Sequence, residues 1–594
     1  MSDQAYSEAQ LVNHLPDEVC VDVSAAPGAD PSALYEQVRA TLNRHLHQDL
    51  PGLTSAHLHR DGLSEPLARD VEPRGVRSIQ GDVLQPSART GGRWVGLPPS
   101  STEREQHWHF YYQVGPDRVS FARSALDERT TRGQQVRQLT NLLNLAALGI
   151  VGAPRGEGWS LSGSQPNWVT SAMPFSCGSP AALPVAATSA DVPGGFEFGD
   201  AAKRALADKG GARHARVIVA ILDTCPTEAK LDDHGNPHLA ELLRTVRRHV
   251  SGTPLSLPLD YFEPPREVPV YWNSLLPWWQ EVMPDADEPP PEFAIPDHGL
   301  FVSGIVHEIA PNVEIHLVRV LNDFGVGDLL GLEQVLRALP DALLRDAGPD
   351  ARLIVNLSLG SAVPVPRRRF FGRWLPDSHT ARPGAWPDDR SNQLLDRAHG
   401  GLASTVRWLH DQGVLVVAAA GNDALRRHLD GELPPPRYPA YYEPVLAVAA
   451  AGHDGAPAAY SNRGDVVPFG NGVTTFGGSI ELAHSDDRPA VTRTGASGGR
   501  QQSIVGLYSS PRLPGGAENR TGWVHWSGTS FAAPIVTALA AQLWQQDAAQ
   551  RPADLIRRVR ECAHNIKAWR AQGRDPDGPL DAPYLEAWQT ATPR

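Results

Sequence analysis

The sequence predicts an α/β protein with a mostly parallel sheet, preceded by a region of α+β character. Three observations predict this. Short apolar runs typical of buried strands recur after residue 212, helical segments separate them, and the preceding region mixes strand and helix patterns. Strands that alternate with helices imply a parallel sheet with helices on both faces. The chain has 594 residues, 41% of them hydrophobic, which is enough for several domains with sizeable cores.

The first predicted domain is an α+β domain at residues 1–177, in which we recognise no catalytic motif. Alternation and helical spacing predict a strand, a helix, an aromatic-rich strand and a second helix, at residues 19–23, 31–50, 107–114 and 134–148. Residues 178–211 are rich in Ala, Pro and Gly, which is typical of a linker. We expect the domain to regulate the rest of the chain, or to select its substrate.

The second predicted domain occupies residues 212–594. Its buried-type strands are expected at residues 217–222, 313–320, 353–359 and 414–420, and its helices at 299–309, 328–344 and 391–412. Two proline-rich inserts, at about 255–293 and 364–390, are expected to be surface excursions. Parallel sheets bind ligands at the carboxyl ends of their strands, and Asp223 and Asn422 stand at two such ends.

Four segments of this domain carry chemistry. They are ILDT (221–224), DHGLFVSGIV (297–306), VVAAAGND (416–423) and SGTSFAAPIVTALAA (527–541). Together they supply a carboxylate, a histidine, an amide and a serine at the start of a helix. Serine is a weak nucleophile that needs a base, and histidine is that base when a carboxylate fixes its tautomer. An amide N–H stabilises the oxyanion that forms on the attacked carbonyl.

In this order, the segments resemble the signature blocks of the subtilisin-like serine proteases (subtilases, peptidase family S8). The resemblance implies a subtilisin-like fold and a hydrolase with the catalytic triad Asp223, His298 and Ser530. In it, Asp223 orients the histidine, His298 is general base and acid, and Ser530 is the nucleophile. The side chain of Asn422 and the backbone N–H of Ser530 form the oxyanion hole.

The resemblance also implies a substrate-binding strand. Ser358, Leu359 and Gly360 match the strand that lines the specificity pocket, and Ala420 and Gly421 match its opposite wall. The likeness extends over roughly residues 212–590, because residues 578–589 resemble the closing helix of the family.

The sequence departs from the family pattern in three places. Cys225 replaces the glycine that usually follows Asp-Thr, either as a thiol open to oxidation or, as we favour, as a tolerated small residue. The first insert carries three tryptophans and either narrows the active-site cleft or packs as a surface flap: Trp272, Trp278 and Trp279. The second insert carries an arginine run, which either favours acidic substrates or is a solvated loop: Arg367, Arg368 and Arg369.

The sequence assigns no metal ligands. The proposed chemistry requires no cofactor. Three His-x-His pairs precede the peptidase region, of which a pair on a strand would share one face: His45/His47, His57/His59 and His107/His109. A small oxygen-rich loop leaves open a structural calcium ion, with no spacing that assigns its ligands: Asp232, Asp233 and Asn236.

Charge and composition narrow the partners. The net charge of −13 argues against nucleic acid, and no run of apolar residues is long enough for a membrane span. The N-terminal residues show no secretory signal, and the four cysteines are scattered, so we expect a cytoplasmic protein. Its partners are then a protein or peptide substrate and, through the N-terminal domain, a regulatory protein.

The sequence thus predicts an intracellular serine endopeptidase, regulated or restricted in its substrates. The N-terminal domain is an inhibitory pro-region, a sensor or a docking module. Two alternatives stay open: a protease dedicated to maturing one precursor, and a non-catalytic binding or scaffold protein on the same fold.

Overall fold

A computed structural model describes most of the chain in two compact units. The described residues are 14–49, 76–79, 82–87, 94–98, 105–115, 119–121, 136, 139–140, 142–144, 146–147, 154, 156–171, 183–208, 215–258, 261, 294–361, 400–422, 424, 435–464, 470–481, 490–491, 500–514, 516–563 and 582–592. The first unit holds the described residues of 1–169, 328–337 and 363–408, and the second unit holds the others. This division differs from the boundary at residue 177 that composition predicts.

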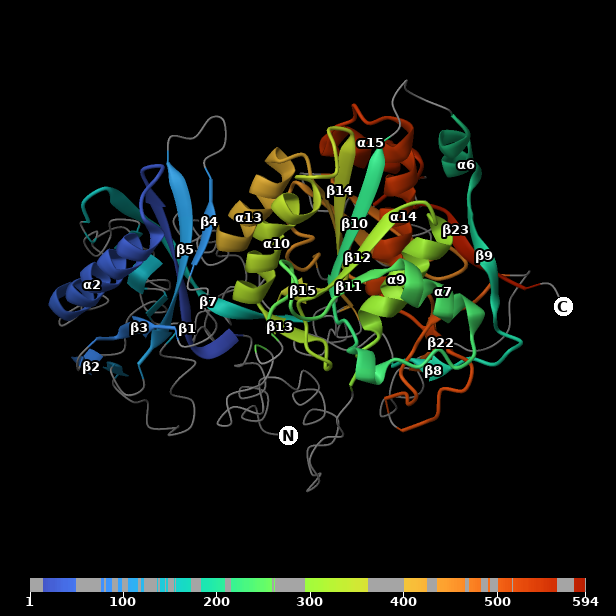
Figure 1. The fold of residues 1–594 in the computed structure, drawn as a ribbon, viewed down its shortest axis with the longest axis horizontal. Coiled ribbons are helices and arrows are strands. Elements are labelled where there is room, and N and C mark those ends of the chain that lie inside the picture. The colour runs from blue at the N-terminus through green and yellow to red at the C-terminus, as the bar shows by residue number, and fades with distance from the viewer. Residues whose placement is uncertain are drawn as a thin grey trace, which may run out of the picture. The chain divides into compact units, whose positions relative to one another are not determined.

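The first unit is built on an antiparallel sheet (Figure 1). Its central strand β1 (His14–Ala25) lies between β5 (Gln106–Val114) and β7 (Trp159–Ser171), and β3 (Leu84–Pro86) and β4 (Trp94–Leu97) pair with β5. A separate ladder joins β2 (Val76–Ile79) to β6 (Val119–Phe121). The predicted strands and first helix of this region are confirmed, and the described residues between 136 and 147 are helical.

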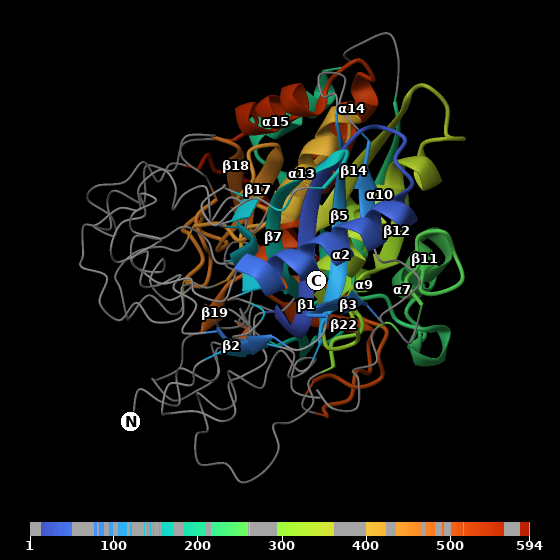
Figure 2. The ribbon, with the colours of Figure 1, turned by 90° about the vertical axis from the view of Figure 1, so that its left-hand side faces the viewer.

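Helix α2 (Pro31–Asp49) lies across one face of this sheet (Figure 2). Successive strand residues point to opposite faces, so the odd-numbered valines of β1 pack with the leucines of α2 in one core. Val19 and Leu42 are fully buried in that core. The even-numbered residues Cys20 and Asp22 therefore lie on the other face.

The second unit is built on a seven-stranded parallel sheet, as the sequence predicts. The strands, in spatial order, are β11 (Arg247–His249), β12 (Glu314–Arg319), β10 (Arg216–Asp223), β14 (Ala351–Leu357), β16 (Leu415–Ala419), β17 (Val445–Ala451) and β18 (Gly472–Phe476). In β10, Val219 and Ala220 point to opposite faces and both are fully buried. Both faces of the sheet are therefore covered.

The helices of the second unit include a central pair, α9 (His298–Ile309) and α14 (Thr529–Gln546), which share the core under the sheet. The others that lie wholly in this unit are α6 (Asp200–Ala207), the 3₁₀ turn η2 (Glu228–Lys230), α7 (Pro237–Thr245) and α15 (Pro552–Glu561). Both α10 (Leu329–Leu343) and α13 (Gly400–Asp411) begin in the first unit and end in the second. These bounds confirm the predicted helices at 299–309 and 328–344.

Small strands complete the second unit. They are β8 (Val185–Ala186), β9 (Pro193–Phe198), β15 (Gly360–Ser361), β19 (Ile480–Glu481), β20 (Ala490–Val491), β21 (Ile504–Leu507), β22 (Trp523–Trp526) and β23 (Ala587–Ala591), and β13 (Val326–Asp328) ends in the first unit. Two predictions are wrong here. The expected linker at 178–211 contains β8, β9 and α6, and the expected closing helix at 578–589 gives way to β23.

Long-range pairing explains both errors. Strand β8 pairs with β22, and β9 pairs with β23, so partners more than three hundred residues away order an Ala/Pro/Gly-rich segment. Most of both proline-rich inserts, including their tryptophans and arginines, lies outside the described residues. Among the described helices, none combines the length and the apolar character that crossing a membrane requires.

Candidate active site

Asp223 and His298 form a buried hydrogen-bonded pair. Asp223 is the last residue of β10, and His298 is the first residue of α9. The carboxylate Oδ1 lies 2.8 Å from His298 Nδ1 and also accepts the backbone N–H of Thr224 at 2.6 Å. Because a carboxylate only accepts, Nδ1 carries the proton and Nε2 is left as the basic nitrogen.

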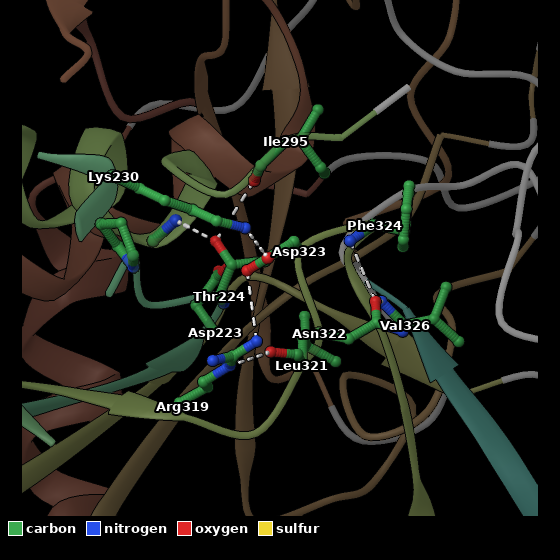
Figure 3. Close-up of polar contacts among 12 residues, drawn as sticks. Asp223, Thr224, Lys230, Ile295, Arg319, Leu321, Asn322, Asp323, Phe324 and Val326 are labelled. Atoms are coloured by element: carbon green, nitrogen blue, oxygen red, sulfur yellow. Dashed lines mark hydrogen bonds and ion pairs between the residues drawn. The ribbon is translucent and has the colours of Figure 1, made fainter. Parts of the chain in front are cut away.

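The backbone around this pair is tightly fitted (Figure 3). The carbonyl of Asp223 accepts the N–H of Val320, and the Thr224 hydroxyl donates to the carbonyl of Ile295 at 3.4 Å and accepts the N–H of Gly299 at 3.1 Å. A Cβ at Gly299 would lie 2.2 Å from the Thr224 carbonyl oxygen. Glycine after the histidine therefore allows α9 to start against the end of β10.

The loop after β12 supports the same strand end (Figure 3). Arg319, which faces Asp223 across the parallel ladder, forms an ion pair with Asp323 at 3.2 Å, and Lys230 reaches the same carboxylate. The side-chain oxygen of Asn322 accepts the N–H of Val326 at 3.0 Å. Asp323 thus pairs with both of these cations, and the Asp223 carboxylate bonds with His298.

Ser530 is the second residue of α14 and is 5% exposed. Its Oγ donates to the carbonyl of Ser358 at 3.1 Å, and the Ser358 hydroxyl donates back to the Ser530 carbonyl at 2.7 Å. The ring of Phe531, the next residue, lies 5.3 Å from the His298 ring. The structure therefore places the residue after Ser530 against His298, and the Ser530 hydroxyl is bonded to the Ser358 carbonyl.

Asn422, which follows β16, bonds with Thr529, the first residue of the same helix. Its Oδ1 accepts the Thr529 N–H at 3.0 Å and the Thr529 hydroxyl at 2.8 Å. The N–H of Gly421, whose φ is 104°, donates to that hydroxyl at 3.2 Å. Because the backbone N–H of Thr529 can only donate, the atom of the Asn422 side chain that it contacts must be the oxygen. The Nδ2 hydrogens of Asn422 are then left for another acceptor.

Aromatic residues that the sequence reasoning missed enclose the histidine. The ring of Trp526 meets His298 edge-on at 5.2 Å, and Phe301 packs on Phe531 at 4.6 Å. Trp526 and Phe531 are themselves 4.9 Å apart. The signal was available, since both aromatics flank the SGTS motif. Together with the rest of the core, these rings leave His298 only 2% exposed.

The last residue of the predicted substrate strand, Gly360, is already paired. Gly360 and Ser361 form β15, which lies antiparallel to the last two residues of β7, with Gly360 opposite Ser171 and Ser361 opposite Thr170. Leu359, next to it, is 2% exposed. Across the site, the Ala420 carbonyl accepts the N–H of Arg437. An edge strand that pairs with an added extended segment is a common way to bind peptides.

Cys225 lies beside the pair in the core of the second unit. It is fully buried, and burial raises the pKa of its thiol to about 12. A protonated, inaccessible thiol is a poor nucleophile and is slow to oxidise. The structure therefore favours the interpretation of Cys225 as a tolerated small residue.

The oxygen-rich loop holds itself together. Asp232 accepts the N–H of His234, Asp233 that of Gly235, and Asn236 caps α7. One oxygen of each side chain thus serves a turn or a helix cap, and a structural calcium ion, which takes about six to eight oxygen ligands, stays a prediction. No cluster of three metal-ligating side chains occurs among the described residues, which leave out His57 and His59.

A model of the subtilase family matches residues 215–572. The chain belongs to the subtilase family. The match covers more than half of the chain and contains the serine, histidine, aspartate and asparagine described above. It confirms the resemblance seen in the motifs, and the parallel sheet confirms the expected fold. Subtilases as a class are serine-type endopeptidases.

Individual relatives of this subtilase are distant. The minor extracellular protease Epr of Bacillus subtilis (strain 168) is 27% identical over 288 residues, which cover 47% of this chain and 30% of that protein. Among solved structures, the prenylagaramide maturation protease PagA is 18% identical, with 65% of this chain and 96% of that chain covered and a TM-score of 0.34. A lanthipeptide protease is 19% identical, with 63% and 86% covered and a TM-score of 0.35.

Proposed function

We propose that this subtilase is a serine endopeptidase that hydrolyses peptide bonds in protein or peptide substrates through an acyl-enzyme on Ser530. The observation that carries the proposal is the buried hydrogen bond between Asp223 and His298, next to the helix that begins at Thr529. A scaffold protein has no need to bury an ionisable pair beside a serine at a helix N-terminus. Buried ionisable groups are costly unless they are paired and hydrogen-bonded, and here the helix that carries the serine packs beside the pair.

The proposed reaction begins with a rotation of the Ser530 hydroxyl from the Ser358 carbonyl toward His298 Nε2. Oγ attacks the scissile carbonyl while Nε2 accepts its proton, and Asp223 stabilises the imidazolium through Nδ1. The imidazolium then gives the proton to the leaving amine. Water repeats the sequence on the acyl-enzyme and releases the acid product.

The oxyanion would be held by two donors. One is the Nδ2 of Asn422, whose Oδ1 is engaged by Thr529. The other is the backbone N–H of Ser530, in the first turn of α14, where helix N–H groups lack acceptors within the helix. The positive end of the helix dipole acts in the same direction. This arrangement requires no cofactor.

We further propose that access to this site is restricted by the chain itself. Residues Thr170 and Ser171 already occupy the edge of β15 to which a peptide substrate would add. A substrate strand that uses the same edge must displace them. This supports a regulated or substrate-restricted peptidase over a broad degradative one, with the N-terminal region as the restricting element or as the docking module of a regulatory protein.

We propose a cytoplasmic location for the described chain. Three of its cysteines, Cys20, Cys225 and Cys562, are buried free thiols, which suits a reducing compartment. A cell needs such a restraint on a peptidase that shares its cytoplasm. Fractionation of cells with an antibody to this chain tests the location, and recovery of the protein from the medium would contradict it.

The test of the peptidase is chemical labelling. Wild type, Ser530→Ala and the control Ser32→Ala, an exposed serine of α2, are treated with a fluorophosphonate and a peptide library. We expect wild type and Ser32→Ala to be labelled and to cleave, and Ser530→Ala to do neither. If wild type is not labelled, the chain is not an active serine peptidase. The cut sites separate a single-precursor protease from one with many substrates.

The test of restriction uses Ser171→Pro against Ser171→Ala. Proline removes the backbone N–H and the strand geometry of this residue, whereas alanine keeps both. We expect Ser171→Pro to raise kcat/KM for short peptides and Ser171→Ala to leave it unchanged. Equal kcat/KM in all three proteins would show that the pairing of β7 with β15 does not limit access.

A further inference from the structure

Asp297, the residue before the histidine, has a fully buried carboxylate with its own partners. One oxygen accepts the Ser509 hydroxyl at 2.9 Å, and the other accepts the backbone N–H of Ser510. These serines follow β21, more than two hundred residues further along the chain. The carboxylate therefore joins the start of α9 to a separate loop.

The same loop reaches His298 by a second route. The ring of Tyr508, directly before the two serines, lies 6.2 Å from that of Trp526, and Trp526 meets His298 edge-on at 5.2 Å. The segment from Tyr508 to Ser510 is thus connected to the histidine through the backbone of Asp297 and through the edge-to-face contacts of Tyr508 with Trp526 and of Trp526 with His298. A displacement of this segment changes the packing on the imidazole from two sides.

Two further side chains complete the attachment of the segment. His234 Nε2 lies 2.9 Å from the Ser509 carbonyl, and Asn519 donates to the Tyr508 carbonyl at 2.7 Å. Hydrogen bonds to an ionised carboxylate are roughly twice as strong as neutral ones. The carboxylate is therefore the strongest of these attachments while Asp297 is ionised, and it weakens when the group takes up a proton.

We propose that Asp297 is a positioning residue for the peptidase reaction: its ionised carboxylate holds the segment from Tyr508 to Ser510 against α9 and so fixes the ring of His298. The inference deepens the proposed function and rests on it. Activity then requires Asp297 to be ionised, in addition to the protonation state that His298 itself needs.

The electrostatic surroundings make this requirement measurable. Burial raises the pKa of Asp297 to about 6, although hydrogen bonds from Ser510 and Ser509 and the charge of His234 act against it. The other titratable groups that face it are His298 on its own helix, Tyr508 after β21 and Cys225 after β10. The carboxyl therefore gains or loses its proton in the range where peptidases are assayed.

The same shift gives a sign for stability. Because the folded-state pKa lies above the ordinary value near 4, the folded protein binds this proton more tightly than the unfolded chain does. Stability therefore falls as the pH rises from about 4 to about 6, and the ionised group is a burden above that range. A residue kept at a cost in stability is typical of a functional position.

The test is Asp297→Asn, which keeps the shape of the side chain and removes its charge. We expect kcat to fall by about ten- to a hundredfold with KM unchanged, as for a small misplacement of a catalytic group. The acid limb of the pH profile of kcat/KM should lose the proton that Asp297 contributes, and the melting temperature at pH 8 should rise. Asp22→Asn, another buried carboxyl with a raised pKa, is the control that should leave the acid limb unchanged.

Outcomes separate this inference from the proposed function. Labelling of wild type by the fluorophosphonate establishes the peptidase whatever Asp297→Asn does. An unchanged kcat and acid limb in a folded Asp297→Asn would overturn the positioning role. If that variant does not fold, Ser509→Ala decides, since it removes one hydrogen bond and keeps the charge. We then expect a lower kcat with the acid limb retained, and a wild-type kcat would overturn the inference.

Discussion

Each compact unit buries a histidine bonded to a carboxylate. In the second unit His298 Nδ1 lies 2.8 Å from Asp223 Oδ1, and in the first His109 Nδ1 lies 3.0 Å from Glu333 Oε2. All four side chains are at most 2% exposed. The chemistry of the two contacts is the same, yet we assign catalysis to one and a structural role to the other. The difference lies in the neighbours of each pair.

Charged and polar groups surround His109. Tyr111 donates to the same oxygen of Glu333 at 3.0 Å, and Asp22 lies on the same face of the sheet. Burial alone would lower the pKa of His109, but the charges of Glu333 and Asp22 outweigh it and raise the pKa to about 9. The His109 imidazole is therefore positively charged and lies beside carboxyl groups.

Aromatic rings and one carboxylate surround His298 instead, with the serine helix at its side. An imidazole with a single carboxylate at Nδ1 keeps Nε2 for a reacting proton. A buried histidine–carboxylate contact therefore does not by itself identify a catalytic pair. The other groups around each pair decide its role.

The largest expected effect breaks the catalytic pair. Asp223→Asn should lower kcat by about 10⁴-fold, the loss found when the aspartate of other serine-protease triads is neutralised, because the amide stabilises the wrong tautomer. Steady-state kinetics on a peptide substrate measure it. Glu333→Gln is the matched change in the other pair, and a similar loss of kcat at saturating substrate there would contradict the distinction.

The next effect breaks the structural pair. Glu333→Gln leaves His109 charged and buried beside fewer counter-charges, which should destabilise the first unit by about 3–5 kcal/mol. Denaturant unfolding followed in a Ser530→Ala background, which prevents self-digestion, measures the loss. Replacing both partners with apolar residues, as in His109→Leu with Glu333→Met, should restore much of it. A double variant no more stable than Glu333→Gln would argue against a buried ion pair.

The catalytic pair could be predicted from the sequence, and the structural pair could not. Asp223, His298 and Ser530 stand in short segments whose order and local pattern point to one chemistry. Glu333 stands 224 residues from His109, in a helix where a glutamate ordinarily faces water. Local periodicity does not encode such a contact, because it depends on which helix covers which face of a sheet.

Some strands and helices could likewise be predicted from the sequence, and others could not. The apolar run at residues 217–222, rich in β-branched residues, predicts a buried strand from local sequence, and the structure has β10 there. The short β8 and β9 exist only because β22 and β23 supply partners. Composition alone therefore predicts a linker at residues 178–211, because it does not reveal these distant partners. The role of Asp297 could not be predicted for a related reason, because its partners Ser509 and Ser510 lie in a loop without a motif.

A smaller expected effect is a dependence of stability on pH that comes from His109. The folded pKa of His109, about 9, lies above the ordinary value near 6.5. Its contribution to stability is therefore full below pH 6.5 and is lost as the pH rises through about 9. Unfolding measured across that window should show the loss in Ser530→Ala and not in the same protein with His109→Gln. His316→Gln, at a buried histidine whose pKa burial lowers, should leave it unchanged.

The smallest effect concerns the thiol beside each pair. Cys20 Sγ donates to Asp22 at 3.4 Å, whereas Cys225 lies in the apolar core next to the end of β10. Burial raises both thiol pKa values, that of Cys225 to about 12. Cys225→Ala should therefore leave kcat unchanged and lower stability by about 1 kcal/mol. Iodoacetamide followed by mass spectrometry should modify neither thiol before unfolding. Modification of Cys225 in the native protein, with loss of activity, would instead make it a redox-sensitive position, because only an accessible thiolate reacts at neutral pH.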